Sequence, residues 1–218
     1  METCRALLLV ALTVTPCAGQ SVGAGRAGPR PPMDRAAEIA LARSAAPASV
    51  SAAARVLVFE NGRFVVADSG RSGAACLVNR SWPASIEPEC FDPEAAATVM
   101  PMTMRRLELH HRGVSPDEVS REIAAGLADG TFRLPSRPAV VYMMSAGQRL
   151  ISDDGRPVGK WKPHRMIYSP YLTDVAVGHH GKPDMSGGLV VDPGQPTSNL
   201  LVIVPEFVPA PGADRSAP

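Results

Sequence analysis

The sequence RVLVFENGRFVVA, residues 55–67, decides the fold class. Two β-rich runs, RVLVFE and RFVVA, flank the dipeptide Asn61-Gly62. A two-residue hairpin turn needs a positive φ at both positions, which Gly adopts freely and Asn tolerates. The stretch therefore predicts an antiparallel hairpin. A third run, AACLVN at 74–79, follows a glycine-rich turn and extends the hairpin to a predicted meander.

Helix signals follow in the middle of the chain. Asp92 is followed by a proline at the first helical position, and Ser115 precedes Glu118 by three residues, which is the spacing of a capping box. These signals predict a helical hairpin over residues 93–129. A separate helix is expected over residues 34–45.

Further apolar runs predict the remaining strands, at residues 139–144, 166–168, 189–191 and 200–204. Prolines at 83, 88 and 93 predict a loop before the helical hairpin. The order of elements favours a single α+β domain over residues 34–204, with a mostly antiparallel sheet and the helical hairpin packed on one face.

Composition agrees with a folded domain and excludes some classes of function. Of the 218 residues, 45% are hydrophobic and 20% are charged, which is typical of a globular protein. The 22 basic and 21 acidic residues give a formal charge of +1. No run of Lys or Arg is present, so the chain lacks the electrostatic signature of a nucleic-acid-binding protein.

The amino terminus resembles an export signal. Arg5 precedes the apolar run ALLLVALTV, and small residues follow it, so residues 1–18 are interpreted as a signal peptide. The run is too short for a transmembrane anchor, and no later segment qualifies, so the mature chain is expected to be exported and soluble. Lipidation at Cys17 stays open. Residues 19–33 are interpreted as a linker and residues 205–218 as a flexible Pro/Ala-rich tail.

Two cysteines remain after removal of the signal, Cys76 and Cys90. In an oxidising compartment such a pair predicts a disulfide, whose loop closure contributes about 3 kcal/mol in the chain-entropy model. The alternative is a redox or metal pair. The separation of fourteen residues differs from a CxxC motif, and this favours the structural bridge.

Four strings carry a resemblance to a known family. They are CLVNRSW (76–82), EPECFDPEAA (87–96), PSRPAVVYMMS (135–145) and PHRMIYSPY (163–171). Over residues 34–204 the chain resembles a family of exported bacterial proteins of unassigned function. The resemblance implies export and a single domain, and it brings no known catalytic residue, cofactor or partner.

The first candidate site is the stretch that carries Trp161, His164, Tyr168 and Tyr171. It is the part of the chain richest in aromatic residues and His, and prolines at 163 and 170 restrict its shape. Aromatic side chains with polar tips suit the binding of a small ligand. The alternative is a loop that packs over the sheet with an internally hydrogen-bonded histidine.

The second candidate is a serine hydrolase. Ser145 follows a predicted strand, His164 is a possible base, and Asp153, Asp154 or Asp174 is a possible orienting acid. The surrounding residues do not match the G-x-S-x-G elbow, so an ordinary turn serine is the competing interpretation.

The third candidate is a copper site. Thioether and imidazole ligands suit copper, and the residues that suggest it are Met100, Met102, Met104, His110, His111, His179 and His180. On regular structure, however, alternating methionines and adjacent histidines point in different directions, so core methionines and surface histidines are the alternative.

The leading interpretation is an exported domain, periplasmic or extracellular, that binds a small ligand or an envelope partner through residues 161–171. The sequence implies no cofactor and no nucleic-acid partner. A serine-type hydrolase and a periplasmic copper protein are the two alternatives, and whether the chain is an enzyme stays open.

Overall fold

The structure is a computed structural model that describes residues 33–80, 85–152, 156–179 and 188–211. Predictions for residues 1–18, for residues 19–32 of the expected linker, and for Asp153, Asp154 and His180 fall outside these ranges. The elements are α1 (Arg35–Arg43), α2 (Ala48–Ser51), β1 (Arg55–Glu60), β2 (Arg63–Asp68), β3 (Ala75–Asn79), β4 (Glu87–Phe91), α3 (Pro93–His111), α4 (Pro116–Ala128), β5 (Ala139–Met143), β6 (Leu150–Ile151), β7 (Pro157–Gly159), β8 (His164–Tyr168), the short 3-10 helix η1 (Val175–Val177), β9 (Leu189–Val191) and β10 (Asn199–Ile203).

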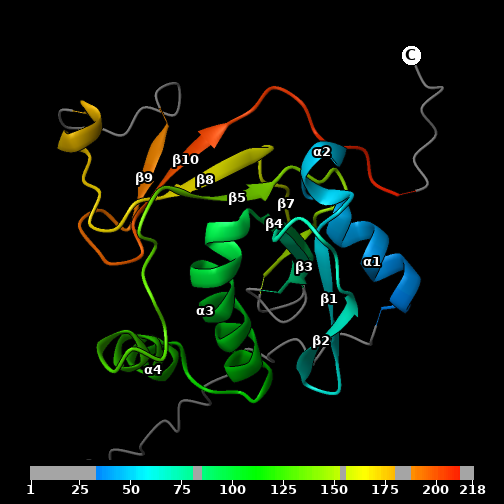
Figure 1. Cartoon of the computed structure of the whole chain (residues 1–218), viewed down its shortest axis with the longest axis horizontal. Coiled ribbons are helices and arrows are strands. Elements are labelled where there is room, and N and C mark those ends of the chain that lie inside the picture. Colours follow the sequence, from blue (N-terminus) through cyan, green and yellow to red (C-terminus); the bar gives the residue numbers. More distant parts are fainter. Residues whose placement is uncertain (1–32, 81–84, 153–155, 180–187, 212–218) are drawn as a thin grey trace, which may run out of the picture.

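An eight-stranded sheet forms the centre of the molecule, with the strand order β2-β1-β3-β4-β5-β8-β10-β9 (Figure 1). All of its pairings are antiparallel except that between β1 and β3. The strands β6 and β7 form a separate two-stranded sheet. The predicted α+β class with a mostly antiparallel sheet is confirmed.

The predicted hairpin is present as β1 and β2. Asn61 and Gly62 occupy the turn with φ values of 50° and 79°, as the Asn-Gly dipeptide indicated. The predicted meander, however, does not continue from β2. Strand β3 lies on the other side of β1 and pairs with it in parallel.

A short connection after β2 explains this difference. It crosses the beginning of β1, where the backbone N–H groups of Arg71 and Ser72 donate to the carbonyl of Ala53. Gly70 lies at the crossing with a φ of +60°, and a Cβ there would lie 2.2 Å from the backbone nitrogen of Arg55. The turn therefore carries the chain to the far edge of β1 and does not return it beside β2.

The loop expected before the helical hairpin contains a strand, so that prediction is wrong in part. Residues 87–91 form β4 and pair with β3, although Pro88 lies within them. Strand β4 pairs with β5 only at Cys90 and Phe91. At Pro88 one side of the strand therefore has no ladder partner, and a residue without an N–H is accommodated there.

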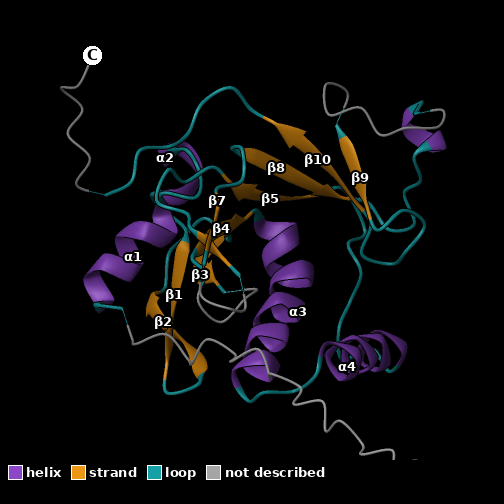
Figure 2. Cartoon of the chain, turned by 180° about the vertical axis from the view of Figure 1, so that it is seen from behind, coloured by secondary structure: helices purple, strands orange, loops and turns teal. Residues whose placement is uncertain are grey.

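Helices cover both faces of the sheet. The predicted helical hairpin is α3 and α4, with the Asp92 cap and the Ser115–Glu118 capping box both present. Helix α3 packs against β2, β3, β4 and β5, whereas α4 packs against α3. Helix α1 packs against β1, β3 and β4 on the opposite face, as Figure 2 shows. Helix α1 is the helix expected over residues 34–45, but the sequence analysis did not assign it to a face of the sheet.

Alternate residues of the strands supply two separate cores. Leu57, Leu77 and Phe91 pack with α3, whereas Val56 and Cys90 pack on the α1 side. This division follows the two-residue period of a strand, which sends successive side chains to opposite faces.

The predicted disulfide between Cys76 and Cys90 is present. The two residues face each other directly across β3 and β4, and neither is exposed to solvent. The bridge joins two central strands on the α1 side of the sheet. No helix among the described residues combines the length and hydrophobicity that spanning a bilayer requires.

The carboxyl-terminal tail is described as far as residue 211. Val208 donates its N–H to the carbonyl of Met144 and accepts a hydrogen bond from the N–H of Ala146. These bonds attach the first part of the tail to the end of β5, in contrast to the flexible tail expected from residue 205 onward.

Candidate functional site

A pocket of about 330 Å³ lies between α3 and the sheet. It forms where the ladder between β4 and β5 ends at the pair Cys90–Tyr142. The lining residues of β3 and β4 are polar (Asn79, Glu87 and Glu89), whereas those of β5, β9 and β10 are apolar (Met143, Val191 and Leu201). Along β3 and β4 the site therefore begins where the apolar core residues Leu77 and Phe91 give way to polar ones.

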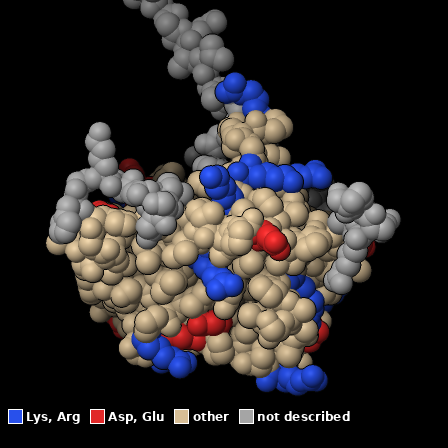
Figure 3. All heavy atoms as spheres, turned by 90° about the horizontal axis from the view of Figure 1, so that it is seen from above, with Lys and Arg blue, Asp and Glu red and all other residues tan. Residues whose placement is uncertain are grey.

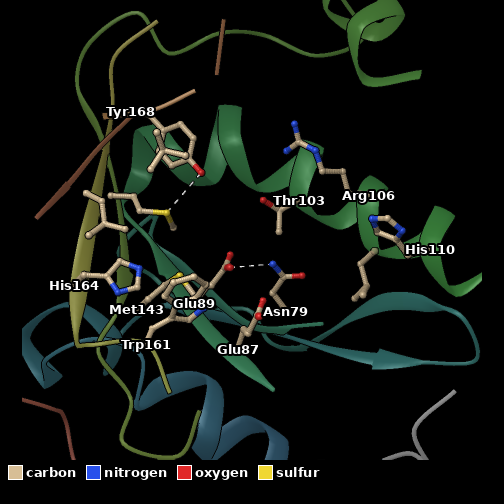
Figure 4. A pocket seen from close by; sticks show the side chains of 14 residues that line it. Asn79, Glu87, Glu89, Thr103, Arg106, His110, Met143, Trp161, His164 and Tyr168 are labelled. Carbon is tan, nitrogen blue, oxygen red and sulfur yellow. Dashed lines mark hydrogen bonds between the residues drawn. The ribbon is translucent and has the colours of Figure 1, made fainter. Parts of the chain in front are cut away.

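Side chains from seven elements and one loop line the pocket (Figure 4). They are Asn79 from β3, Glu87 and Glu89 from β4, Thr103, Arg106, Leu107 and His110 from α3, Met143 from β5, Trp161 from the loop before β8, His164, Met166 and Tyr168 from β8, Val191 from β9 and Leu201 from β10.

Three of the four residues in the predicted ligand-binding stretch line this pocket: Trp161, His164 and Tyr168. Tyr171 does not, and its side chain is 59% exposed. The strand period accounts for part of this result, because residues 164, 166 and 168 of β8 share one face. Tyr171 lies beyond the end of the strand with a positive φ of 61°.

Two buried carboxyl groups form the floor of the pocket. Glu87 and Glu89 are alternate residues of β4 and project to the same side, with exposed fractions of only 3% and 5%. The side-chain amide of Asn79 donates to Oε1 of Glu89 at 2.9 Å. No other hydrogen bond to Glu89 occurs in the parts of the chain that the structure describes.

Burial disfavours the charged form of Glu89 and raises its pKa to about 8. The nearby charge of Glu87 acts in the same direction. The hydrogen bond from Asn79 and the positive charge of Arg106 oppose this shift and do not cancel it. Glu89 therefore holds a proton at neutral pH.

His164 is a neutral imidazole with a defined tautomer. Its Nδ1 lies 2.7 Å from the carbonyl oxygen of Lys162, so Nδ1 carries the hydrogen and donates it. Burial lowers the pKa of His164, while the bond to Lys162 acts in the opposite direction. Nε2 is thus left as an acceptor on a ring that lines the pocket.

Aromatic rings flank the carboxyl groups. Trp161 is 44% exposed, and its ring meets that of His164 edge to face at 6.3 Å between centroids. Tyr168 is partly buried, and the desolvation of its phenol, together with the charge of Glu89, raises its pKa. Its hydroxyl is therefore a hydrogen-bond donor at all physiological pH values.

Helix α3 supplies the opposite wall of the pocket. Thr103, Arg106 and His110 lie on successive turns and so share one side of the helix. Figure 4 shows them across the pocket from the carboxyl groups of β4. Arg106 brings a permanent positive charge to this wall.

The serine-hydrolase candidates are not brought together by a hydrogen bond. Ser145 is 1% exposed, its Oγ lies 2.6 Å from Oγ of Ser44, and it accepts from the N–H of Gly147 at 3.0 Å. His164 instead bonds to Lys162 and lines the pocket, which does not include Ser145. Asp174 lies near His179, with 3.9 Å between Oδ1 and Nδ1.

The copper candidates are dispersed. Met100 belongs to the core beneath α3, Met102 is buried, and Met104 packs against that core. His110 lines the pocket, whereas its neighbour His111 packs edge to face on Phe59. In the described parts of the chain, no cluster of three or more His, Cys, Asp or Glu side chains is arranged to hold a metal ion.

The sequence analysis missed the pocket residues from β3, β4 and α3 apart from His110, which it named as a copper candidate. Glu87 and Glu89 were assigned to a loop because of Pro88, and Arg106 had no distinguishing neighbours in the sequence. One signal was present: two glutamates at alternate positions in EPECF, beside a cysteine and a phenylalanine, which are residue types that folded proteins usually bury. Such a pattern indicates carboxyl groups on one face of a buried strand.

The pocket combines hydrogen-bond acceptors, proton donors and aromatic surface in a water-accessible volume suited to a small ligand. Glu89 can donate a proton, and His164 can accept one.

Uncharged residues cover most of the molecular face seen in Figure 3, with Lys, Arg, Asp and Glu interspersed among them. Comparison of the chain with protein-family models, curated proteins and solved structures found no match.

Proposed function

We propose that the chain binds a small organic molecule in the pocket between α3 and the sheet. One observation carries the proposal: Trp161, His164 and Tyr168 line a cavity of about 330 Å³ together with the buried Glu87 and Glu89. Binding pockets of this size join apolar walls to a few polar groups that orient the ligand. A small molecule fits a cavity better than a flat protein partner does.

The proposal includes export to the periplasm or the extracellular space. The disulfide between Cys76 and Cys90 supports this part, because such bonds persist in oxidising compartments. The signal-like segment at residues 1–18 supports it from the sequence. The serine-hydrolase and copper alternatives have no comparable support from the arrangement of Ser145 or of the methionines.

A fragment titration tests the proposed function. The purified protein is titrated with small aromatic fragments that bear ammonium, hydroxyl or carboxylate groups, and its amide NMR spectrum is recorded. We expect saturable shifts at residues that line the pocket. Trp161→Ala should weaken binding at least about tenfold, because it removes aromatic contact surface.

Tyr171→Ala is the matched control, because it removes an aromatic side chain ten residues further along that does not line the pocket. It should leave the affinity unchanged. Equal losses in both variants would assign binding to the exposed surface of residues 161–171. Saturable shifts confined to residues outside the pocket would overturn the proposal.

A further inference from the structure

The pocket contains a buried carboxyl group of which one oxygen has no partner among the described residues. Glu89 is nine-tenths buried, and Oε1 accepts from Asn79, but Oε2 has no hydrogen-bond partner among the described residues. No Lys, Arg or His nitrogen of those residues lies within 4.0 Å of its carboxyl group in an ion pair. A buried carboxyl group normally gains such a partner, because its desolvation is otherwise uncompensated.

Aromatic surface flanks the carboxyl groups. Trp161 presents a partly exposed ring, and Tyr168 contributes a second ring from β8. The faces of such rings attract cations, because their quadrupole is negative above the ring. A positively charged group that contacts Oε2 of Glu89 would meet this surface as well.

The balance of charge in the lining also favours a cation. Glu87 supplies one acidic group, Glu89 supplies a second negative charge when it releases its proton, and Arg106 is the one permanently charged base among the lining residues. His164 is held neutral by its burial. An anionic ligand could pair with one guanidinium group but would lie close to two carboxyl groups. A cation can contact the carboxyl groups of the floor, while the guanidinium lies on the opposite wall.

We infer that the ligand of this pocket is a small organic cation, an amine whose ammonium group contacts Glu89 beside Glu87 and whose apolar part lies against Trp161. The inference rests on the proposed function, since it names the ligand class of the same site. It follows from the unpartnered carboxyl oxygen of Glu89, the aromatic wall and the acidic floor taken together.

Binding of an amine requires Glu89 to release its proton. The pKa of Glu89 is about 8, so in the free protein its ionised fraction rises about fiftyfold between about pH 6 and about pH 8. The affinity for an ammonium ion should rise by the same factor. The groups that face Glu89 and titrate or carry charge are Glu87 on its own strand, Arg106 and His110 on α3, and His164 and Tyr168 on β8.

Three probes of equal size test the ligand class: benzylammonium, benzyl alcohol and benzoate. Their dissociation constants for the full chain, with its disulfide intact, are measured by calorimetry. We expect benzylammonium to bind at least about tenfold more tightly than benzyl alcohol, and benzoate to bind most weakly. Glu89→Gln should abolish the preference for the cation and its dependence on pH, while binding of benzyl alcohol persists.

Glu206→Gln is the matched control, because it removes an exposed carboxylate outside the pocket. It should preserve the preference for the cation. If benzyl alcohol or benzoate binds as tightly as benzylammonium, the inferred ligand class is overturned and the proposed function stands. If none of the probes binds and the broader set of fragments also fails, both are overturned.

Discussion

Replacing Glu89 by glutamine should make the folded protein more stable at neutral and alkaline pH. The change keeps the size of the side chain and retains an oxygen that can accept from Asn79. It removes a carboxyl group that is buried beside Glu87 without an ion pair. A group retained at a cost in stability is typical of a binding site.

The magnitude follows from the two pKa values of Glu89. In the unfolded chain the ordinary value is 4.5, and in the folded protein it is about 8. Because the folded-state value is raised, the stabilising effect of the bound proton is complete below pH 4.5 and is lost as the pH rises to about 8. Each pH unit corresponds to about 1.4 kcal/mol, so about 3 kcal/mol has been lost at pH 7.

Urea unfolding of the wild type and of Glu89→Gln, followed by tryptophan fluorescence at several pH values, measures this effect. The difference between the two curves isolates Glu89 from other titrating groups, such as Glu38, whose burial also raises its pKa. We expect the variant to gain about 3 kcal/mol at pH 7 relative to its effect at pH 4.5. A difference that does not change with pH would refute the assignment of Glu89 as a buried, proton-bound group.

Three further predictions concern the fold and the site. Gly70→Ala should lower the free energy of unfolding by about 3 kcal/mol or more, because the new Cβ would meet backbone atoms at the crossing. Gly113 also has a positive φ but no atom within 4 Å of the added Cβ, so Gly113→Ala should cost only about 1 kcal/mol. Equal losses in urea unfolding would contradict this prediction. Joint replacement of Cys76 and Cys90 by serine should lower stability by about 3 kcal/mol, and an unchanged urea midpoint would refute the structural role of the bridge. Burial lowers the pKa of His164 below its ordinary value of 6.5, so the neutral ring stabilises the fold above that pH and this stability is lost as the pH falls. His164→Gln should reduce the loss of stability between pH 7 and pH 5. An unaltered loss would contradict the assignment of His164 as a neutral imidazole.

Local signals in the sequence predicted the local structure well. The Asn61-Gly62 turn and the caps at Asp92 and Ser115 depend on backbone geometry within a few residues, and each appears as expected. The disulfide was also predicted, because only Cys76 and Cys90 remain after the expected signal segment. Such features need no knowledge of distant parts of the chain.

Features that depend on distant contacts were predicted less well. The parallel position of β3 depends on where a short connection crosses β1, which residue type alone does not specify. Pro88 indicated a loop because proline has no N–H to donate to a neighbouring strand. The strand forms nevertheless, because β4 pairs with β5 only at Cys90 and Phe91, beyond the proline. Local propensity was therefore overridden by position in the sheet.

The candidate site shows the same division. Trp161, His164 and Tyr168 were identified because they lie close together in the sequence. Glu89 and Arg106 meet them only through the folding of β4 and α3 against β8. The aromatic half of the pocket was thus predictable from the sequence, whereas its acidic floor and its positive wall were not.

The most direct test of the central claim is a crystal structure of the protein with benzylammonium. The account predicts the probe in the pocket between α3 and the sheet, with its nitrogen about 2.8 Å from Oε2 of Glu89 and its ring against Trp161. A probe bound elsewhere at saturating concentration, or side chains that fill the pocket, would contradict it.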